Sequence, residues 1–269
     1  MSGTVITDSK VDVPETGTQA ASRVADVLLF FMGEEHRPGV SAIASGLDIS
    51  KAVVHRILQS LVARRLVVAD ELTRTYSLGP AAAALGARAL RDLDLRTTAL
   101  PVLRRLHDDT GETATISALV GSARVYLDQI VSVKQIRMTV ELGRPYPLYA
   151  GASSKAILAI APADLRDRVL SGALAPLTED TIGNRATLES ELRQIAAEGV
   201  AVSLGERQTG AGSVAAAVIG FDGSVVGSIS ICGPVHRFDA ATIESLKPLV
   251  RDAAAEICRA MRHGSHPGR

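Results

Sequence analysis

The chain has 269 residues, of which 46% are hydrophobic and 22% are charged. Its formal net charge is zero, which excludes binding to nucleic acid through a global positive field, so any affinity for phosphate must come from a local patch. The longest apolar runs are too short to cross a bilayer and the N-terminus lacks a signal-peptide pattern. We therefore expect a soluble cytoplasmic protein with no membrane partner.

Metal sites and cofactors are not expected. The two cysteines, Cys232 and Cys258, are too few for a disulfide framework or a four-ligand zinc site, and we interpret both as buried thiols. Among the six histidines only His263 and His266 have ligand-like spacing, and they lie in a polar tail that contains Gly and Pro. We predict neither a metal nor a cofactor.

The N-terminal part begins with a polar stretch over residues 1–18, which we predict to be a disordered tail. A helix is expected from Ala20 to near Gly33, because apolar residues recur there at helical spacing. A short helix over residues 40–45 should end in a left-handed turn at Gly46. Ser50 then suits the N-cap of a third helix.

The third helix has two distinct faces. One face is apolar and the opposite face is polar, and the segment from Ser50 to Leu66 contains four cations and no acid. The β-prone segments 66–69 and 75–78 follow, joined by a polar turn that favours a hairpin. Three helices and a hairpin predict a winged helix-turn-helix over residues 19–79. The apolar face consists of Val54, Ile57, Leu58 and Leu61.

This helix is the candidate DNA-binding element, because a helix in the major groove needs one face for its own domain and one for the duplex. The alternative is an ordinary solvated cationic face, but the uncompensated charge and the surrounding elements favour DNA. At the hairpin tip, Arg74 fits a phosphate or minor-groove contact and a solvated turn cation equally well. The candidate DNA-binding residues are Ser50, Lys51, His55, Arg56, Gln59 and Arg74.

Beyond the hairpin, the Ala-rich segment 80–95 predicts a linker helix with a seam of Leu85, Leu90 and Leu93. The pattern then becomes mixed α/β over residues 96–263, before a flexible tail over 264–269. We predict an α+β chain of two domains. Helices are expected at 97–110, 152–161, 163–171, 187–198 and 239–262, the last kinked or confined in its first turn by Pro248, and strands at 113–120, 123–132, 135–141, 200–203, 213–219 and 225–232.

The last predicted hairpin suggests a binding surface. Strand alternation places Val225, Ile229 and Ile231 on one face, and small residues such as Ser230 and Cys232 on the other. The partner strand alternates in the same way and adds Ser213 to the small-residue face. Such a face indicates the close approach of either a packed helix or a small ligand, and the sequence leaves both open.

Four blocks of the sequence resemble the IclR family of bacterial transcription regulators. They are "AIASGLDISKAVVHRILQSLVARRLV", "PYPLYAGASSKAILA", "GVAVSLGERQTGAGSVAAAV" and "GSVVGSISICGPVHRF", in the order that the family shows. The resemblance implies a GAF-like effector-binding domain, dimerisation or a dimer of dimers, and a palindromic double-stranded DNA operator. Ala52 and Val53 stand where the family usually has hydroxyl residues, which puts one or two phosphate contacts in doubt.

The effector pocket implied by the resemblance lies beside the helix expected from residue 152. Backbone donors of Gly151 and Ala152 would suit a carboxylate, and Ser213, Ser230 and Cys232 offer short hydrogen-bonding groups. Ser203 stands where some members have an acid, and Ser213 where some have a cysteine, so the ligand class does not transfer from the family. We expect a small organic acid.

The sequence therefore predicts a DNA-binding transcriptional regulator, with repression favoured, whose operator affinity depends on an organic acid. One alternative is an architectural DNA-binding protein that responds to no ligand. Another is an enzyme using the C-terminal pocket, but Ser153, Ser154 and Lys155 point to different faces of a helix and form no nucleophile and base pair. We expect no enzymatic activity.

Overall fold

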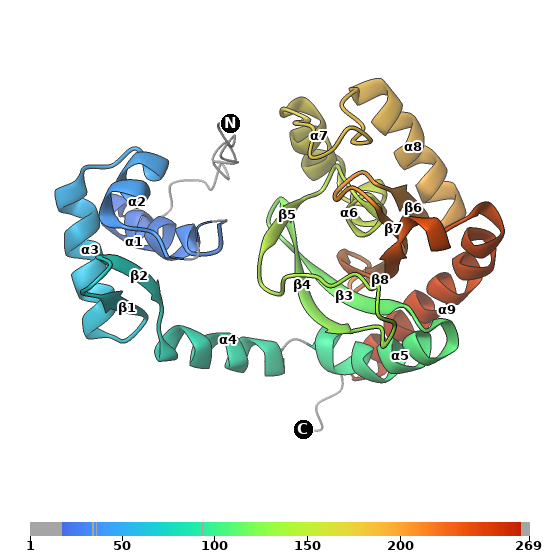
Figure 1. Cartoon of the computed structure of the whole chain (residues 1–269), viewed down its shortest axis with the longest axis horizontal. Helices are drawn as coiled ribbons and strands as arrows, with labels where there is room; N and C mark the ends of the chain where they lie inside the picture. The colour runs from blue at the N-terminus through green and yellow to red at the C-terminus, as the bar shows by residue number, and fades with distance from the viewer. Residues whose placement is uncertain (1–17, 34, 36, 93, 265–269) are drawn as a thin grey trace. The chain divides into compact units, whose positions relative to one another are not determined.

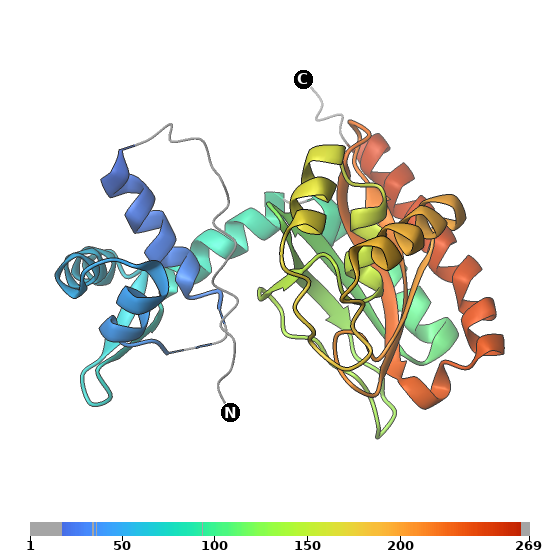
Figure 2. The same cartoon turned by 90° about the horizontal axis from the view of Figure 1, so that it is seen from above.

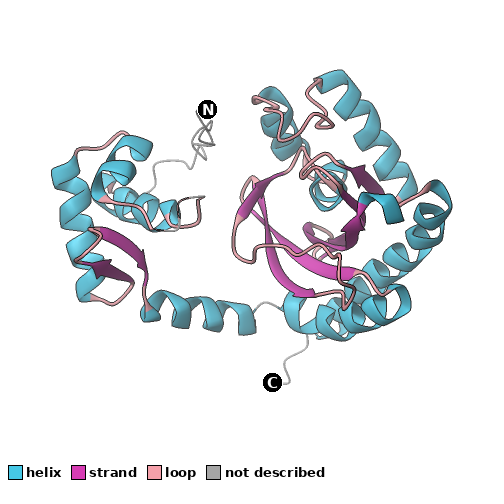
Figure 3. Cartoon of the chain, viewed as in Figure 1, coloured by secondary structure: helices cyan, strands magenta, loops and turns pink. Residues whose placement is uncertain are grey.

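The structure is a computed structural model that describes residues 18–33, 35, 37–92 and 94–264, without the side chains of 87–94 and 263–264. The predicted tails lie outside these residues, apart from Thr18 and Gly264. The chain divides into two compact units, residues 1–92 and 93–269, and each is considered by itself. Figure 3 shows strands in both units, few in the first and more in the second.

The first unit contains the predicted winged helix-turn-helix. Its elements are α1 (Gln19–Phe30), α2 (Val40–Leu47), α3 (Lys51–Ala63), the antiparallel strands β1 (Val67–Asp70) and β2 (Thr75–Leu78), and α4 (Pro80–Asp92) (Figure 1). Its core is formed by the inner faces of α1, α2 and α3, where Val27, Ile43, Val54 and Leu58 are fully buried. Leu85 of the expected α4 seam is 64% exposed in the single chain, and the side chains of Leu90 and Leu93 lie outside the described residues.

The predicted role of Gly46 is wrong. This glycine lies inside α2, and the left-handed residue that ends the helix is Asp48, with φ 51°. Asp adopts this conformation more readily than most residues. Gly46 is needed for a different reason, because a Cβ there would lie 2.4 Å from the Phe30 ring.

The second unit contains one antiparallel six-stranded sheet in the order β5-β4-β3-β8-β7-β6. The mixed α+β architecture is as predicted. The strands are β3 (Thr113–Val120), β4 (Ala123–Ile130), β5 (Pro145–Pro147), β6 (Ala201–Leu204), β7 (Ala211–Ile219) and β8 (Val225–Pro234). The helices are α5 (Asp94–Thr110), α6 (Ala152–Ala159), α7 (Ala163–Ser171), α8 (Arg185–Glu198), the short 3-10 helix η1 (Val235–Arg237) and α9 (Ala240–Gly264).

Helices cover both faces of this sheet (Figures 1 and 2). On one face α5 and α9 lie side by side and bury Ile116, Val214 and Ile229. On the other face α6 packs against β7 and β8, with α8 behind it. Pro248 lies inside α9 beyond its first turn, so it does not mark the start of that helix.

The strand predicted over residues 135–141 is absent, and the edge of the sheet is formed by β5 in a segment expected to be a loop. The side-chain amide of Gln129 takes the place of strand pairing. It donates to the Val140 carbonyl at 2.8 Å and accepts from the Val140 amide at 2.9 Å. A single side chain therefore satisfies backbone groups that would otherwise need a neighbouring strand.

The alternation predicted for β7 and β8 is confirmed except at one residue. Ile229 and Ile231 face α5 and α9, while Ala215 and Ser230 share the opposite face. Val225 was predicted to lie with the isoleucines but packs in the α6 cluster. A register shift after Val218 pairs Ile219 with Val225, and one extra residue reverses the direction of the side chains beyond it.

Candidate functional site

The first candidate site is the exposed face of α3. Ser50 caps this helix, its hydroxyl oxygen accepting the Val53 amide at 3.4 Å, as predicted. The predicted apolar face is buried against α1 and α2. The opposite face leaves four predicted DNA-binding residues exposed, namely Lys51, His55, Arg56 and Gln59.

The next feature is how the polar side chains of this face are engaged within the described part of the chain. Among the residues that the structure describes, no hydrogen bond or ion pair is found for the side chains of Lys51, His55, Arg56 or Gln59. Arg64 differs, because it folds back onto the Ser60 carbonyl at 2.9 Å. The first two turns of α3 therefore present donors that a phosphate or a base edge can use.

The predicted wing residue Arg74 lies in the turn between β1 and β2. Its backbone has φ 55° and its side chain is exposed. Asp70 shapes this turn by accepting the amides of Leu72 and Thr73 at 3.0 and 3.2 Å. These hydrogen bonds hold the pKa of the Asp70 carboxyl below its usual value. Arg74 is therefore displayed at the tip of a preformed turn.

The second candidate site is a small cavity of about 20 Å³ where α6 begins. Five of the six predicted effector residues line it: Gly151, Ala152, Ser213, Ser230 and Cys232. Ser203 is buried opposite Ser213 on β6 but does not line the cavity. The structure thus brings together residues from β7, β8 and the start of α6 that are far apart in the sequence.

One predicted donor of this pocket is already engaged. The Gly151 amide donates to the Glu206 carboxylate at 3.2 Å, and Lys155, which is fully buried on α6, donates to the same carboxylate and to Glu191. Burial raises the pKa of the Glu206 carboxyl, and Lys155 and the Gly151 amide oppose this shift. The backbone donors left for a ligand therefore begin at Ala152, because the amides of a first helical turn have no partner within the helix.

Sequence reasoning missed Arg124, Tyr126, Met138 and Arg207, which also line the cavity. Arg124 is 1% exposed, donates from Nε to the Ser154 hydroxyl at 2.9 Å and stacks on Tyr126 with 4.1 Å between Cζ and the ring centre. Its Nη1 is buried and has no hydrogen-bond partner in the described ranges of the chain. A buried donor of a charged group without a partner is costly, so this atom marks a position for an anion.

The floor of the pocket is polar but uncharged. The hydroxyls of Ser230 and Thr115 lie 2.7 Å apart and hydrogen-bond to each other. Burial raises the pKa of the Cys232 thiol to about 12, so it remains protonated and is a weak donor at neutral pH. These groups suit hydrogen bonding to a small oxygen-bearing ligand.

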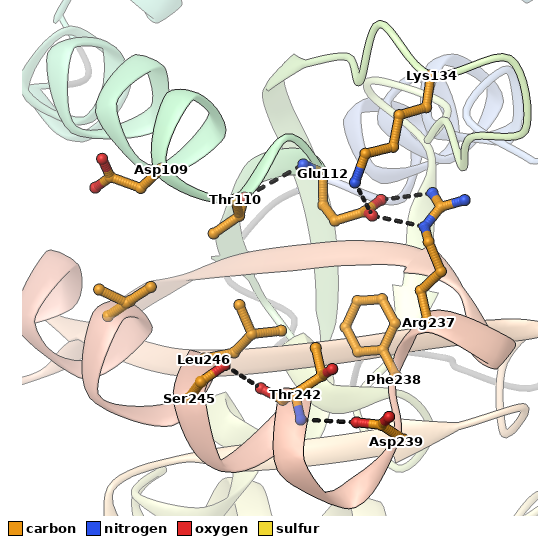
Figure 4. Close-up of a pocket in the computed structure, with 11 residues that line it drawn as sticks. Asp109, Thr110, Glu112, Lys134, Arg237, Phe238, Asp239, Thr242, Ser245 and Leu246 are labelled. Carbon is orange, nitrogen blue, oxygen red and sulfur yellow. Dashed lines mark hydrogen bonds and ion pairs between the residues drawn. The ribbon is translucent and has the colours of Figure 1, made fainter.

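A larger, open cavity of about 470 Å³ lies between the end of α5, η1 and the start of α9 (Figure 4). Three of its charged groups, Glu112, Arg237 and Lys134, are paired with one another. Glu112 accepts from both Nε and Nη2 of Arg237, at 2.6 and 2.7 Å, and from Lys134 at 2.7 Å. Because both cations of this cavity are engaged with Glu112, whereas Arg124 has a buried donor without a partner among the described residues, we consider the smaller pocket the better candidate.

Comparison with known proteins bears on both units. A family model described as bacterial transcriptional regulator IclR C-terminal matches residues 87–259, and one described as IclR helix-turn-helix domain matches residues 20–71. The chain belongs to the IclR family. The predicted resemblance is confirmed, and the protein is a DNA-binding transcriptional regulator.

Several relatives in this family are similar over most of their length. The chain is 33% identical over 242 residues to the HTH-type transcriptional regulator BhcR of Paracoccus denitrificans, covering 90% of this chain and 86% of BhcR. It is 30% identical over 256 residues to the HTH-type transcriptional repressor AllR of Escherichia coli K12, covering 95% and 94%. A crystallised IclR transcriptional regulator of Silicibacter sp. TM1040 is 25% identical, with a TM-score of 0.84 over 90% of this chain and 96% of that one.

Two further observations concern the described residues alone. None of their helices combines the length and the apolar character that a membrane span requires. Nor do they bring three or more His, Cys, Asp or Glu side chains together in a way that would hold a metal ion.

Proposed function

We propose that this IclR-family regulator is a repressor whose operator affinity is set by a small organic acid bound at the start of α6. A homodimer, or a dimer of dimers, would read a palindromic operator through two copies of α3. The DNA contacts would come from Ser50, Lys51, His55, Arg56 and Gln59, and from Arg74 on the wing. The cytoplasmic location expected from the sequence remains a prediction.

The exposed, unengaged face of α3 is the observation that most supports the DNA-binding part. Its cations have no intramolecular partner among the described residues, so their charge is available to phosphate. The helix N-terminus capped by Ser50 adds its own preference for an anion near Lys51. The relative named as a repressor, AllR, supports repression over activation.

The unpartnered Nη1 of Arg124 supports an anionic effector. A ligand can regulate only if its affinity differs between two conformations of the protein. Since α6 packs on β7 and β8 and its N-terminus lines the pocket, an acid bound there would contact both helix and sheet. Its binding energy would then depend on how those elements are arranged.

The experiment that tests the DNA-binding residues is a titration of the DNA flanking the protein's own gene at several salt concentrations. Arg56→Ala and Lys51→Ala should each weaken binding, and each lost phosphate contact should reduce the slope of log affinity against log salt by about one. A residue that reads a base would instead give a sequence-selective loss of about 1–3 kcal/mol. Unchanged slopes and unchanged selectivity in both variants would contradict the assignment.

Arg193→Ala serves as the matched control, because Arg193 is an exposed arginine on α8 of the second unit. It removes the same charge from the chain and should leave the salt slope as in the unmodified protein.

The same titration with a panel of carboxylates tests regulation. Operator affinity that responds to none of them would favour the architectural alternative.

An enzyme is disfavoured by the partners of the relevant groups. Lys155 is held between Glu191 and Glu206, and the Ser154 hydroxyl accepts from Arg124. Neither group is therefore paired with the other as a nucleophile and its base would be.

A further inference from the structure

The pocket at the start of α6 contains two guanidinium groups, those of Arg124 and Arg207. Arg124 is almost fully buried, and Arg207 passes over Gly151, where a Cβ would lie 3.4 Å from the Cβ of Arg207. Both arginines are held by aromatic rings, and within the described part of the chain neither makes an ion pair with an acid.

Three acids near this pocket are engaged with other groups, and the first of them, Glu141, pairs with Arg144 at 3.3 Å. Glu206 is bound by Lys155 and the Gly151 amide, and Glu112 by Arg237 and Lys134. Burial lowers the pKa of Arg124, Tyr126 opposes this shift, and the like charge of Arg207 lowers the pKa further. The guanidinium group of arginine nevertheless carries its positive charge in proteins generally. Two positive charges therefore face one pocket without compensation.

The distance between the two charges is limited by a shared neighbour. The Cζ atom of Arg124 lies 5.1 Å from the centre of the Tyr146 ring, and that of Arg207 lies 5.0 Å from it. The two Cζ atoms are thus no more than about 10 Å apart. A carboxylate carbon lies roughly 4 Å from a guanidinium carbon in a paired geometry, so a span of this size accommodates two carboxylates on a very short chain.

The free volume also favours a short ligand. About 20 Å³ is space for one or two water molecules, so any ligand must displace the flexible side chains of Met138 and Arg207 as it enters. The displacement is smallest for the shortest acids. The hydroxyl groups of Ser213 and Ser230 line the pocket and offer hydrogen bonds to the oxygen atoms of such an acid.

We propose that the effector of this regulator is a short dicarboxylate, with one carboxylate bound by Arg124 and the start of α6 and the other by Arg207. This inference rests on the proposed function, which places an organic acid in the same pocket. It adds the number of charges and the length of the acid.

The test compares three ligands of equal carbon number that have two, one and no negative charges: malonate, propionate and propionamide. Each is titrated calorimetrically into the full-length chain at about pH 7.5, where carboxylic acids are ionised, and at constant ionic strength. We expect malonate to bind at least about tenfold more tightly than propionate, and propionamide to bind most weakly.

Two variants locate the charges. Arg207→Gln should bring the ratio of malonate to propionate affinity toward one, whereas Arg193→Gln, which alters an exposed arginine outside the pocket, should leave the ratio unchanged. Arg124→Met should abolish binding of both acids and raise the unfolding temperature of the ligand-free protein, because it removes an uncompensated buried charge. A lower unfolding temperature for Arg124→Met would contradict that charge assignment.

The possible outcomes separate the two proposals. Equal affinity for malonate and propionate, with propionamide weaker, would overturn the dicarboxylate and leave the organic-acid effector standing. Propionamide binding as tightly as propionate would contradict both, and no binding of any of the three would overturn the short dicarboxylate.

Discussion

Buried charged residues in the second unit fall into two groups, those paired with an opposite charge and one that is not. Lys155 and Glu206 neutralise each other directly, and Glu112 is neutralised by Arg237 and Lys134. Arg124, by contrast, contacts an aromatic ring and one hydroxyl, and no acid among the residues that the structure describes. An ion pair can stabilise the folded chain only at a pH where both of its groups are charged. A buried charge without a partner lowers the stability of the fold and favours the binding of an anion.

Glu112 should make the stability of the second unit depend on pH. Burial acts to raise the pKa of its carboxyl, but hydrogen bonds from Arg237 and Lys134 outweigh burial and hold the pKa below its usual value. A carboxyl of this kind stabilises the fold above its unfolded pKa, and the stabilisation is lost as pH falls through the folded pKa. We expect the unfolding temperature to decrease as the pH is lowered from about 5 to about 3, and to decrease less steeply in Glu112→Gln.

Thermal unfolding at a series of pH values measures this effect. Asp109→Asn is the control, because Asp109 lines the same cavity but is exposed and should leave the profile as it was. If the unfolding temperature of Glu112→Gln decreases with pH as steeply as that of the unmodified protein, Glu112 is not the source of the pH dependence.

Gly46 and Gly86 both lie in helices but differ in their surroundings. A Cβ at Gly46 would meet the Phe30 ring at 2.4 Å, whereas nothing lies within 4 Å of a Cβ at Gly86. Gly46→Ala should destabilise the first unit by about 1–3 kcal/mol, because the ring must move. Gly86→Ala should be neutral or stabilising by up to about 1 kcal/mol, and chemical denaturation measures both. A stabilising Gly46→Ala would show that the ring yields freely.

Helix α3 combines two functions along its length. Its buried face anchors it to α1 and α2, and its opposite face, which begins at the cap, carries the proposed DNA contacts. The cap and the proposed phosphate contact meet at Ser50, whose hydroxyl oxygen accepts the Val53 amide while its proton remains free to be donated.

Substitutions of Ser50 should separate these two functions. Ser50→Asp and Ser50→Asn both retain a good N-cap, so the unfolding temperature should change little, whereas Ser50→Ala should cost about 1 kcal/mol. Only Ser50→Asp places a negative charge against phosphate, and it should weaken DNA binding well beyond Ser50→Asn. Calorimetry and operator titration read the two effects. Equal DNA affinity for the Asp and Asn variants would place Ser50 away from the phosphates.

The molecule as a whole is organised as two units with separate cores. Val27, Ile43, Val54 and Leu58 form the first, and the sheet with α5, α6 and α9 encloses the second. Because no described residue of one cluster belongs to the other, each core can be altered while the other is left intact.

Calorimetry should therefore show two unfolding transitions. Leu58→Ala, at a fully buried position, should reduce the free energy of unfolding of the first unit by about 2–5 kcal/mol, and should lower the temperature of that unit's transition alone. A ligand of the α6 pocket should raise only the transition of the second unit, since it binds that folded unit alone. A single transition that both changes shift together would contradict independent units.

Much of the first unit could be predicted from the sequence because its signals are local. The apolar stripe of α3, the cap at Ser50 and the polar turn between β1 and β2 each depend on residues within one or two turns of chain. The alternation of β7 and β8 is likewise local, and it was wrong only at Val225, where a register shift depends on how two strands meet.

The amino-acid sequence alone thus determined which helix carries cations on its exposed face, and which face of the β7–β8 hairpin carries small residues. Only the tertiary structure decided that Arg124 is buried. Arg124 lies on β4, and α6, which covers it and contacts it through Ser154, comes about thirty residues later in the sequence. In the same way, the Glu206 carboxylate accepts a hydrogen bond from the Gly151 amide, which lies 55 residues earlier in the sequence. Contacts of this kind have no local period, because they depend on which distant segment comes to lie over a given face.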